Sequence, residues 1–412
     1  MSVWYLHHYA GHPKVGMSFR PYYLARGIQD LNEDVVVFAA SYHHLKKNNG
    51  MQKKQAVIEN VDGVSYCWIK TRAYKGNGLA RVLNMLQFAI SLLFLNPVCR
   101  FNFDKPKHII VSSAHPFHFL AGWLYSKRYG STLSFEIRDI WPLSLTNLLG
   151  LSPYHPFCLL LKFFELIAYK YSDLVISVLP NGIEYLKNKG VSESKYLYLP
   201  NGIYLSDKSK ECDLTQHDHQ VLQKMKKICS SFEQVFLYAG AHGIPNNLQI
   251  LIESMQYVSE NYALVLVGDG ELKQCLYSVA LEHDLKNVFF LDKVSKSCTS
   301  QLIKESDVCV ISAKKSPLYK YGVSMNKLFD YMLEAKPVLF AIDSPNSVIE
   351  QSGAGIVVPS NLAKDISIGM EQLARMNKDE KNKMGLLGRH FVLKNHSFSV
   401  LAKKLLTSLN KI

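Results

Sequence analysis

Residues 321–340 read YGVSMNKLFDYMLEAKPVLF, and this stretch carries the strongest structural signal in the chain. Its apolar side chains recur at spacings of three and four, which predicts a helix with one buried face. The residues of that face are Leu328, Phe329, Met332 and Leu333. Ala335-Lys336-Pro337 ends the helix, because proline has no N–H to donate, and Val338–Ala341 then predicts a buried parallel strand. A helix that leads into a buried strand is typical of a doubly wound α/β fold.

The start of this predicted helix also carries chemistry, because Lys327 and Asp330 stand three residues apart there. Unpaired N–H groups at a helix N-terminus bind phosphate, and a lysine adds a point charge. The Asp330 carboxylate could accept hydrogen bonds from a vicinal diol such as ribose. The alternative is an ordinary amphipathic helix on which the two side chains form a solvated pair.

Strand and helix patterns alternate along all 412 residues, a length that indicates two domains. The first half contains a helical pattern at 19–31 among short apolar runs. Those runs are 3–5, 35–39, 108–112, 133–137 and 174–177, and the second half repeats them at 235–238, 264–267, 288–291, 308–311, 338–341 and 356–358. The pattern predicts two Rossmann-like, doubly wound α/β domains in tandem. Ligands bind beyond the carboxyl ends of strands in such sheets, so we expect the active site in a cleft between two facing domains.

The domain boundary is expected near residue 203. Leu199-Pro-Asn-Gly202 is a turn signal, and the polar stretch 206–220 is typical of a linker or surface loop. This gives one Rossmann-like domain over residues 1–202 and a second over 203–385. Residues 386–412 are expected to form a helical segment that packs back on the first domain.

The chain is basic, and the excess charge lies in its first half. Its formal net charge is +13; residues 1–200 hold 22 Lys and Arg against 12 Asp and Glu, which is +10. Such an excess indicates an anionic partner: a phosphorylated substrate, an anionic membrane surface or nucleic acid. Since no RNA-binding signature accompanies it, nucleic acid is ranked last. Eight cysteines without a C-x-x-C pair, and no signal-peptide pattern, predict reduced thiols and a cytoplasmic protein.

The segment 79–103 is conspicuously apolar, and Arg72, Lys75, Arg81 and Arg100 flank it. Its most apolar run, Phe88–Leu95, is far shorter than the roughly 20 residues of a transmembrane helix. An interfacial helix lying on a bilayer and a buried core helix both fit this pattern.

Two glycine turns follow predicted strands of the second half. Gly240-Ala-His-Gly243 precedes a helix expected near Asn246, and small residues there let a phosphate approach free N–H groups. Gly268-Asp-Gly270 follows the next strand, where the simpler interpretation is a tight turn between strand and helix. His242 is expected either to donate to a phosphate or to cap the adjacent helix.

The order of these motifs resembles the GT4 family of glycosyltransferases with the GT-B fold, close to its WbuB-like branch of O-antigen and capsule enzymes. The resemblance spans nearly the whole chain. It rests on GMSFRPYYLAR (16–26), SSAHPFHFLAGWL (112–124), FEIRDIWPLSL (135–145), YSDLVISVLPNGIEYL (171–186), LPNGI (199–203), YAGAHGIPNN (238–247), VLVGDGEL (265–272), NKLFDYMLEAKPVLFAI (326–342) and GAGIVVP (353–359).

The resemblance implies that residues 1–202 form an acceptor-binding domain and residues 203–385 a nucleotide-sugar-binding domain, which holds the donor site. Asp330 would contact the donor ribose and Lys327 the phosphates, with Leu328 between them. Gly322 stands where the broader family has a second acid. The segment 238–247 also lacks the Arg and Lys with which many relatives bind the diphosphate, and Lys314, Lys315 and Lys320 are candidates to replace them. Gly16 matches the family's loop over the diphosphate. The expected donor-binding residues are therefore Gly16, Gly240, His242, Gly243, Asn246, Gly268, Lys327, Leu328 and Asp330.

In the first half, Arg138 and Asp139 follow a predicted strand, as residues of a cleft should. The resemblance implies contact with the donor sugar or orientation of the acceptor, whereas the alternative is a local ion pair. His115 is a candidate general acid or base, because its ordinary pKa is near neutral. His118 follows three residues later, but no further ligands stand at zinc-site spacing, so no metal is expected.

The implied reaction is retaining transfer of a hexose or N-acetylhexosamine, without cofactor or metal, from a UDP-sugar donor to a lipid-linked saccharide acceptor. We expect such a protein on the cytoplasmic face of the plasma membrane, bound to its anionic surface. Alternatives are a nucleotide-sugar-binding protein of the same fold and a UDP-sugar epimerase.

Overall fold

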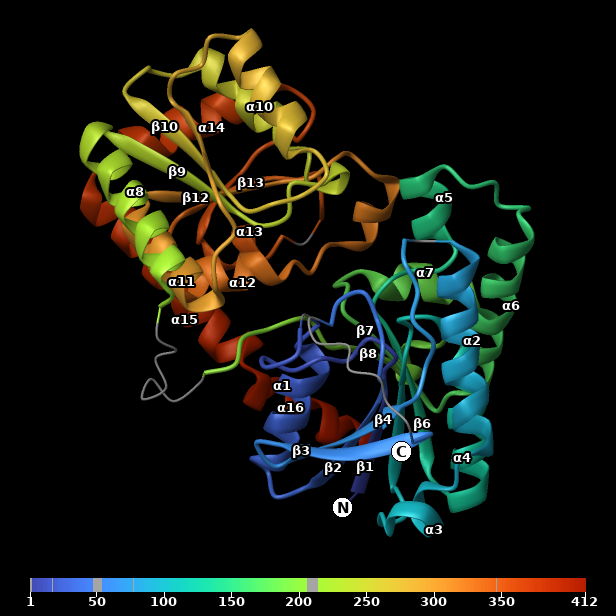
Figure 1. The fold of residues 1–412 in the computed structure, drawn as a ribbon. Coiled ribbons are helices and arrows are strands. Elements are labelled where there is room, and N and C mark those ends of the chain that lie inside the picture. The colour runs from blue at the N-terminus through green and yellow to red at the C-terminus, as the bar shows by residue number, and fades with distance from the viewer. Residues whose placement is uncertain (1, 17, 47–53, 77, 206–213, 346) are drawn as a thin grey trace. The chain divides into compact units, whose positions relative to one another are not determined.

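The fold described below is that of a computed structural model, which describes the chain except residues 1, 17, 47–53, 77, 206–213 and 346 (Figure 1). The chain divides into two compact units. Unit 1 contains Met1–Tyr204 and Phe398–Ile412, and unit 2 contains Leu205–Ser397. The predicted C-terminal segment is therefore not one piece, because its residues up to Ser397 belong to unit 2 and only the last helix belongs to unit 1. The predicted linker 206–220 lies largely outside the described residues.

Unit 1 is built around a sheet with the order β3-β4-β2-β1-β5-β6-β7-β8. Its strands are β1 (Ser2–Leu6), β2 (Asp34–Ala40), β3 (Ala56–Val61), β4 (Val64–Ile69), β5 (His108–Ser112), β6 (Thr132–Ile137), β7 (Leu174–Ser177) and β8 (Tyr196–Tyr198). All neighbours pair in parallel except β3 and β4. β1 lies between β2 and β5, so its carboxyl end is at the middle of the sheet edge where ligands bind.

Helices cover both faces of this sheet (Figure 1). They are α1 (Arg20–Gln29), α2 (Leu79–Phe94), α3 (Pro97–Phe101), α4 (Phe119–Tyr129), α5 (Leu143–Leu149), α6 (Pro156–Tyr171), α7 (Gly182–Lys187) and α16 (Phe398–Leu409), with short 3-10 turns η1 (Pro116–His118) and η2 (Glu193–Lys195). On one face α16 packs against α1, and on the other face α4 packs between the sheet and α2. The backbone N–H of Phe398 donates to the carbonyl of Ile203, which joins the two points where the chain crosses between units.

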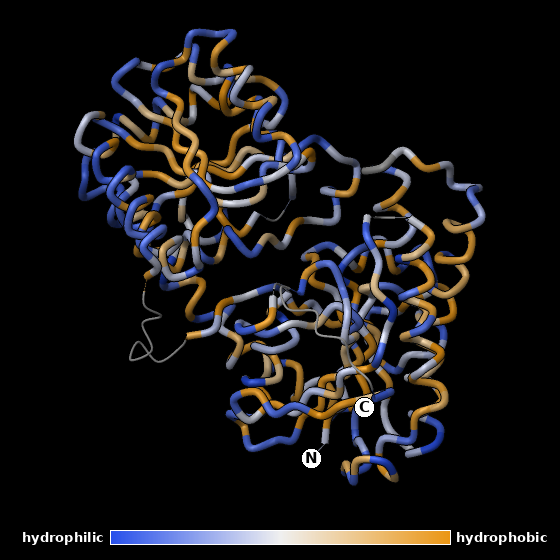
Figure 2. The backbone as a smooth tube through the Cα atoms, in the orientation of Figure 1, coloured by the Kyte–Doolittle hydropathy of each residue, from blue (hydrophilic) through white to orange (hydrophobic). Residues whose placement is uncertain are grey.

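Unit 2 repeats the architecture with a smaller, wholly parallel sheet of order β11-β10-β9-β12-β13-β14. Its strands are β9 (Gln234–Ala239), β10 (Tyr262–Val267), β11 (Val288–Leu291), β12 (Val308–Ser312), β13 (Val338–Ala341) and β14 (Gly355–Val357). Its helices are α8 (Gln216–Ser231), α9 (Leu248–Ser254), α10 (Lys273–Glu282), α11 (Lys296–Glu305), α12 (Asn326–Leu333), α13 (Val348–Ser352), α14 (Ala363–Arg375) and α15 (Lys378–His396), with η3 (Ile244–Asn246), η4 (Met255–Tyr257) and η5 (Pro317–Tyr321). Its strands are coloured as hydrophobic along much of their length, as expected for a sheet covered on both faces (Figure 2).

The predicted strands and the α/β class are confirmed in both units. The sequence interpretation missed the antiparallel β3–β4 hairpin and the short β8. A signal for the hairpin was present: Asp62-Gly63 joins two strands with φ of 50° and 93°, which is the left-handed backbone that a tight two-residue turn needs.

The predicted helix at 79–103 is α2, and it has two apolar faces. Met85, Phe88 and Leu92 are buried, whereas Leu79 and Phe94 are 73% and 82% exposed. Within the described residues, no helix is long and apolar enough to cross a membrane. The structure thus contains features of both alternatives that the sequence left open.

Candidate functional site

Lys327 is the centre of a polar cluster at the carboxyl edge of the second sheet. It lies in the first turn of α12, and its Nζ donates to Tyr238 Oη at 2.7 Å and to Asn246 Oδ1 at 2.9 Å. The ammonium also lies 4.2 Å from the centre of the Tyr238 ring. These partners are neutral, and burial lowers the pKa of Lys327 to about 7. A cation held by neutral groups alone is suited to an anionic ligand.

Side chains of α12 fix the end of strand β9 beside this lysine. Tyr331 Oη accepts from the N–H of Ala239 at 2.8 Å, while Tyr238 Oη and Asn246 Nδ2 both donate to the carbonyl of Ala241, each at 2.9 Å. The loop between β9 and η3 is therefore folded around one carbonyl and held against the N-terminus of α12. Lys327 and Asn246, both predicted from the sequence, are brought into direct contact.

The glycine turns lie one on the other. A Cβ at Gly268, where φ is +147°, would come within 1.9 Å of the Gly240 carbonyl oxygen. A Cβ at Gly240 would lie 3.2 Å from Lys327 Nζ, whereas a Cβ at Gly243 would meet only Pro245, at 3.8 Å. Gly268 is thus required for packing, as the simpler interpretation expected. Gly240 leaves space beside the cation, and Gly243 leaves its loop open.

His242 is fully buried between the two glycine turns. Its backbone N–H donates to the Asp269 carbonyl at 2.9 Å, and its ring lies near Tyr238 and Phe290. Neither ring nitrogen has a hydrogen-bond partner among the described residues, so the expected helix cap is not formed. Burial, with Lys273 nearby, lowers its pKa to about 4, and the ring is neutral at physiological pH.

Asp330 faces away from Lys327. Its carboxylate lies 3.7 Å from Lys296 Nζ of α11 and is 36% exposed, so the solvated pair between Lys327 and Asp330 is not formed. Leu328 is 1% exposed, which leaves only its backbone for a ligand. Of the three lysines proposed as replacement cations, Lys314 and Lys315 are exposed, while Lys320 lies 4.9 Å from the centre of the Tyr321 ring.

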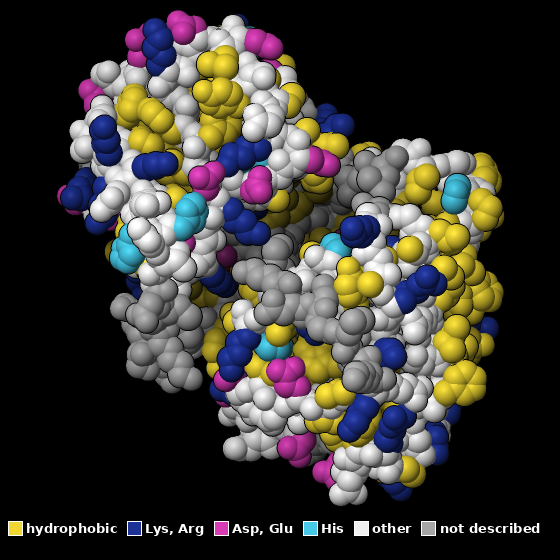
Figure 3. Space-filling model, viewed as in Figure 1, with side chains coloured by type: hydrophobic (Ala, Val, Ile, Leu, Met, Phe, Trp, Pro, Cys, Tyr) yellow, Lys and Arg dark blue, Asp and Glu magenta, His cyan; other side chains and the backbone are white. Residues whose placement is uncertain are grey.

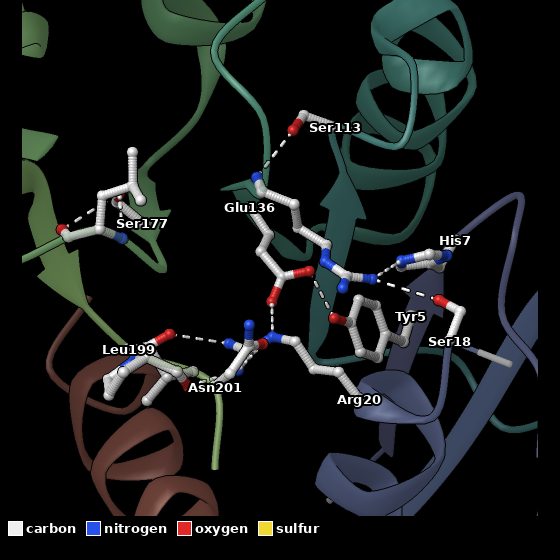
Figure 4. Close-up of polar contacts among 12 residues, drawn as sticks. Tyr5, His7, Ser18, Arg20, Ser113, Glu136, Ser177, Leu199 and Asn201 are labelled. Carbon is white, nitrogen blue, oxygen red and sulfur yellow. Dashed lines mark hydrogen bonds and ion pairs between the residues drawn. The ribbon is translucent and has the colours of Figure 1, made fainter. Parts of the chain in front are cut away.

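In unit 1, Arg138 follows the end of β6 and reaches two residues from the loop after β1. Its Nη1 donates to His7 Nε2 at 2.9 Å and to Ser18 Oγ at 3.3 Å, and its backbone N–H donates to Ser113 Oγ (Figure 4). Asp139 is exposed, and no ion pair joins it to Arg138. The alternative prediction, a local ion pair between Arg138 and Asp139, is therefore not seen in the described structure.

His115 is buried at the start of η1, against His118. Since His118 Nε2 lies 3.2 Å from the Leu6 carbonyl, it carries the proton, and His118 Nδ1 then accepts from His115 Nδ1 at 3.4 Å. This leaves His115 Nε2 as a buried acceptor without a partner in the described part of the chain. Burial, with His8 and His118 nearby, holds the pKa of His115 well below its usual value.

Gly16 packs against the segment after β2 rather than standing free. It forms an isolated bridge with Lys46, and a Cβ there would come within 2.2 Å of the Leu45 carbonyl oxygen. The close approach of the Leu45 backbone therefore explains why position 16 is a glycine. Among the described residues, no group of three or more His, Cys, Asp and Glu side chains is arranged to hold a metal ion.

The sequence interpretation missed the partners of the predicted residues: His7, Ser18, Tyr238 and Tyr331. His7 is the first of two adjacent histidines, His7-His8, and Tyr238 ends a predicted strand. Neither carries a local signal that names its partner.

The comparisons with known proteins agree with this architecture. Residues 233–376 match the family model "Glycosyl transferases group 1". The matched residues lie within unit 2. An uncharacterized glycosyltransferase of Methanocaldococcus jannaschii, MJ1059, is 28% identical over 149 residues, which cover 35% of this chain and 35% of that relative.

Solved structures resemble the whole chain in fold. Sucrose-phosphate synthase of Thermosynechococcus elongatus has a TM-score of 0.73 at 14% identity, covering 100% of this chain and 98% of that one. Anabaena HepE in complex with UDP-glucose has 0.66 at 12%, with full coverage of both chains. WaaG, a glycosyltransferase involved in lipopolysaccharide biosynthesis, has 0.65 at 13%, covering 98% of each. The fold class is therefore GT-B, while the match to the group 1 family model is confined to residues 233–376.

Proposed function

We propose that the protein is a retaining glycosyltransferase that moves a hexose or N-acetylhexosamine from a UDP-sugar to a saccharide on a polyprenyl diphosphate, in assembly of a surface polysaccharide such as O-antigen or capsule. The observation that carries the proposal is Lys327, a half-buried cation with neutral partners at the first turn of α12. Because the described site lacks a carboxylate beside this ammonium, a diphosphate would supply the missing negative charge.

The residues around Lys327 take separate tasks in this proposal. The free N–H groups of α12 and the Lys327 ammonium bind the diphosphate and stabilise it as it leaves, without metal or cofactor. Asp330, partly exposed one turn later, accepts hydrogen bonds from the ribose hydroxyls. Gly240 leaves room for phosphate oxygens beside Lys327 Nζ. In the first unit Arg138 and Asp139 meet the acceptor and the transferred sugar, whereas His115 is buried and is not exposed to them in this structure. HepE, which has been solved with UDP-glucose, has a similar fold and supports the choice of donor.

Calorimetric titration of the full chain with UDP tests the donor site. We expect Lys327→Met to weaken UDP binding by about ten- to a hundredfold, because a hydrogen bond to a charged group is lost. Lys286→Met is the matched control, since Lys286 is 86% exposed and pairs only with Asp284 across 3.6 Å. Equal affinities of the two variants would refute the assignment of Lys327.

Transfer itself is tested by incubating UDP-sugars with a synthetic polyprenyl-diphosphate saccharide and analysing the product by mass. A product heavier by one hexose or N-acetylhexosamine supports the proposal. UDP binding without transfer from any donor would point to a binding protein, and release of a free 2-epimerised sugar would point to an epimerase.

We further propose that unit 1 binds the anionic cytoplasmic surface of the plasma membrane. Figure 3 shows hydrophobic side chains along the edge of unit 1 where α2, α4 and α6 lie. Exposed members include Phe94 of α2, Leu124 of α4 and Phe163 of α6, at 82%, 44% and 58%. Exposed basic residues accompany them, including Lys75, Lys127 and Lys162. Apolar and basic side chains on one surface are typical of interfacial binding.

Co-sedimentation with phosphatidylglycerol-containing vesicles measures this binding. We expect Phe94→Asp and Phe163→Asp each to reduce the bound fraction, while Tyr277→Asp, at a 52% exposed position of unit 2, leaves it unchanged. Binding that is indifferent to both phenylalanines and to neutralisation of Arg72 and Lys75 would exclude this surface.

A further inference from the structure

Two polar layers lie one above the other at the carboxyl edge of the first sheet (Figure 4). The inner layer joins Tyr5 of β1, Glu136 of β6 and Arg20 of α1. The outer layer joins His7 and Arg138, the first residues after β1 and β6, to Ser18, which precedes α1. Both layers therefore tie together the same three elements.

The inner layer is closed and electrically neutral. Arg20 Nε donates to Glu136 Oε1 at 2.9 Å, and both side chains are at most 2% exposed. Tyr5 Oη donates to the other carboxylate oxygen, and Arg20 Nη2 donates to the Leu199 carbonyl at 2.9 Å. Burial alone would raise the pKa of Glu136, but Arg20, Arg138 and Tyr5 together hold it below its usual value. Arg20 is thus the salt-bridge partner of Glu136, and Arg138 forms no salt bridge among the described residues.

The outer layer is open. Arg138 is half-buried and uses only Nη1 of its guanidinium, so its other N–H groups make no hydrogen bond to the described residues. His7 accepts from Arg138 and is neutral, since burial and Arg138 hold its pKa well below the usual value. Asp139, the nearest acid along the chain, forms no salt bridge with Arg138 among the described residues; desolvation raises the pKa of its carboxyl, and the charge of Arg138 opposes that rise. The result is a fixed cation with unused donors.

We propose that the outer layer is an oxyanion-binding site, in which Arg138 receives a phosphate or carboxylate group of the acceptor while His7 and Ser18 hold the guanidinium in place. Assignment of the anion to the acceptor rests on the proposed function; the existence of the site does not. A planar guanidinium fork matches two oxygens of such a group, and a charged side chain already held by the fold loses little entropy on binding. Ser18 has a φ of +73°, an unusual conformation for a residue other than glycine, and it brings Oγ within reach of Arg138.

The test is calorimetric titration of full-length Lys327→Met protein, in which the cation of unit 2 no longer contributes. The probes are inorganic pyrophosphate, methyl glucuronide and, as its neutral counterpart, methyl glucoside. We expect binding of pyrophosphate or glucuronide but not of glucoside; preference for pyrophosphate would indicate the lipid diphosphate, and preference for glucuronide an acidic sugar.

Variants then locate the site. Arg138→Gln should weaken anion binding about tenfold or more, because a charge-assisted bidentate contact is lost. Ser18→Ala should weaken it a few-fold, and Asp139→Asn should strengthen it. Arg128→Gln is the matched control at an exposed arginine of α4. If Arg138→Gln, folded by circular dichroism, binds the anions as tightly as Arg128→Gln, or if glucoside binds equally well, the proposal is overturned. UDP binding to the Lys327 site is measured in a separate titration. Failure of the proposed donor site and failure of the proposed oxyanion site can therefore be told apart.

Discussion

Acid should destabilise unit 1 through buried histidines, and His118 gives a direct measure of the effect. His118, the last residue of η1, is fully buried, and burial lowers its pKa to about 4; the pKa of buried His43 is lowered to about 3. The unfolded chain binds protons near pH 6.5, whereas the folded unit does not. Stability is therefore full above pH 6.5 and is lost as pH falls from 6.5 towards the folded-state pKa.

The magnitude follows from these shifts. Between pH 7.5 and pH 5, each of the two histidines should lower the free energy of unfolding by about 2 kcal/mol. Glu165 works in the opposite direction, because burial raises its pKa to about 7 and acid then adds about 2 kcal/mol. His7, His8 and His115 have pKa values well below the usual one and add to the loss. We expect a net loss of at least about 2 kcal/mol, a sizeable share of the stability of a domain.

Tryptophan fluorescence during urea unfolding measures this loss in unit 1 alone. All four tryptophans, Trp4, Trp68, Trp123 and Trp141, belong to that unit. The comparison that isolates one histidine is wild type against His118→Gln, whose amide can still donate to the Leu6 carbonyl. The change in unfolding free energy between pH 7.5 and pH 5 should be smaller in the variant by about 2 kcal/mol. An identical pH dependence in both proteins would refute the reasoning.

Three further predictions concern single side chains. Lys327 has a pKa of about 7, and a bound diphosphate would raise it. Above pH 7 the dissociation constant of UDP should therefore rise by up to about tenfold per pH unit, and calorimetry in buffers of different ionisation enthalpy should detect proton uptake on binding. A dissociation constant that stays the same from pH 7 to 9 would contradict this. Gly268→Ala should lower the free energy of unfolding of unit 2 by about 2 kcal/mol or more, measured by circular dichroism during unfolding. Gly243→Ala, where the added Cβ meets open space, should lower it by less than about 1 kcal/mol. Equal losses of stability in the two variants would count against the contact between Gly268 and the Gly240 carbonyl. Between pH 5 and pH 8 the gain in unfolding free energy of unit 1 should be about 2–3 kcal/mol larger in Glu165→Gln than in wild type, because the buried carboxylate no longer has to ionise. An unchanged pH dependence of tryptophan-detected unfolding would exclude that role.

Local pattern was sufficient for much of the fold. The strands of unit 2 are apolar runs bounded by turn residues, and α12 shows the spacing of a buried helical face, so both could be predicted without knowing what they contact. The β3–β4 hairpin was missed although Asp62-Gly63 signalled its turn. The apolar segment at 79–103 could not be assigned to core or surface, because α2 packs one apolar face inward and exposes another.

The candidate site divides in the same way. Lys327, Gly240 and Arg138 could be proposed because each follows or begins an element whose end lies at the ligand-binding edge of a parallel sheet. Their partners could not. Tyr238 is 89 residues from Lys327, His7 is 131 from Arg138, and Arg20 is 116 from Glu136.

The sequence by itself therefore determined the α/β class, the two-fold repetition of that architecture and the elements that carry the candidate residues, because periodicity and turn chemistry act over a few neighbouring residues. Only the tertiary structure decided which charges are matched. Arg20 neutralises Glu136 and leaves Arg138 open, and Lys327 is held by neutral groups alone. The physical reason is that strand order brings distant residues together at one sheet edge, and burial there fixes both their hydrogen bonds and their pKa values.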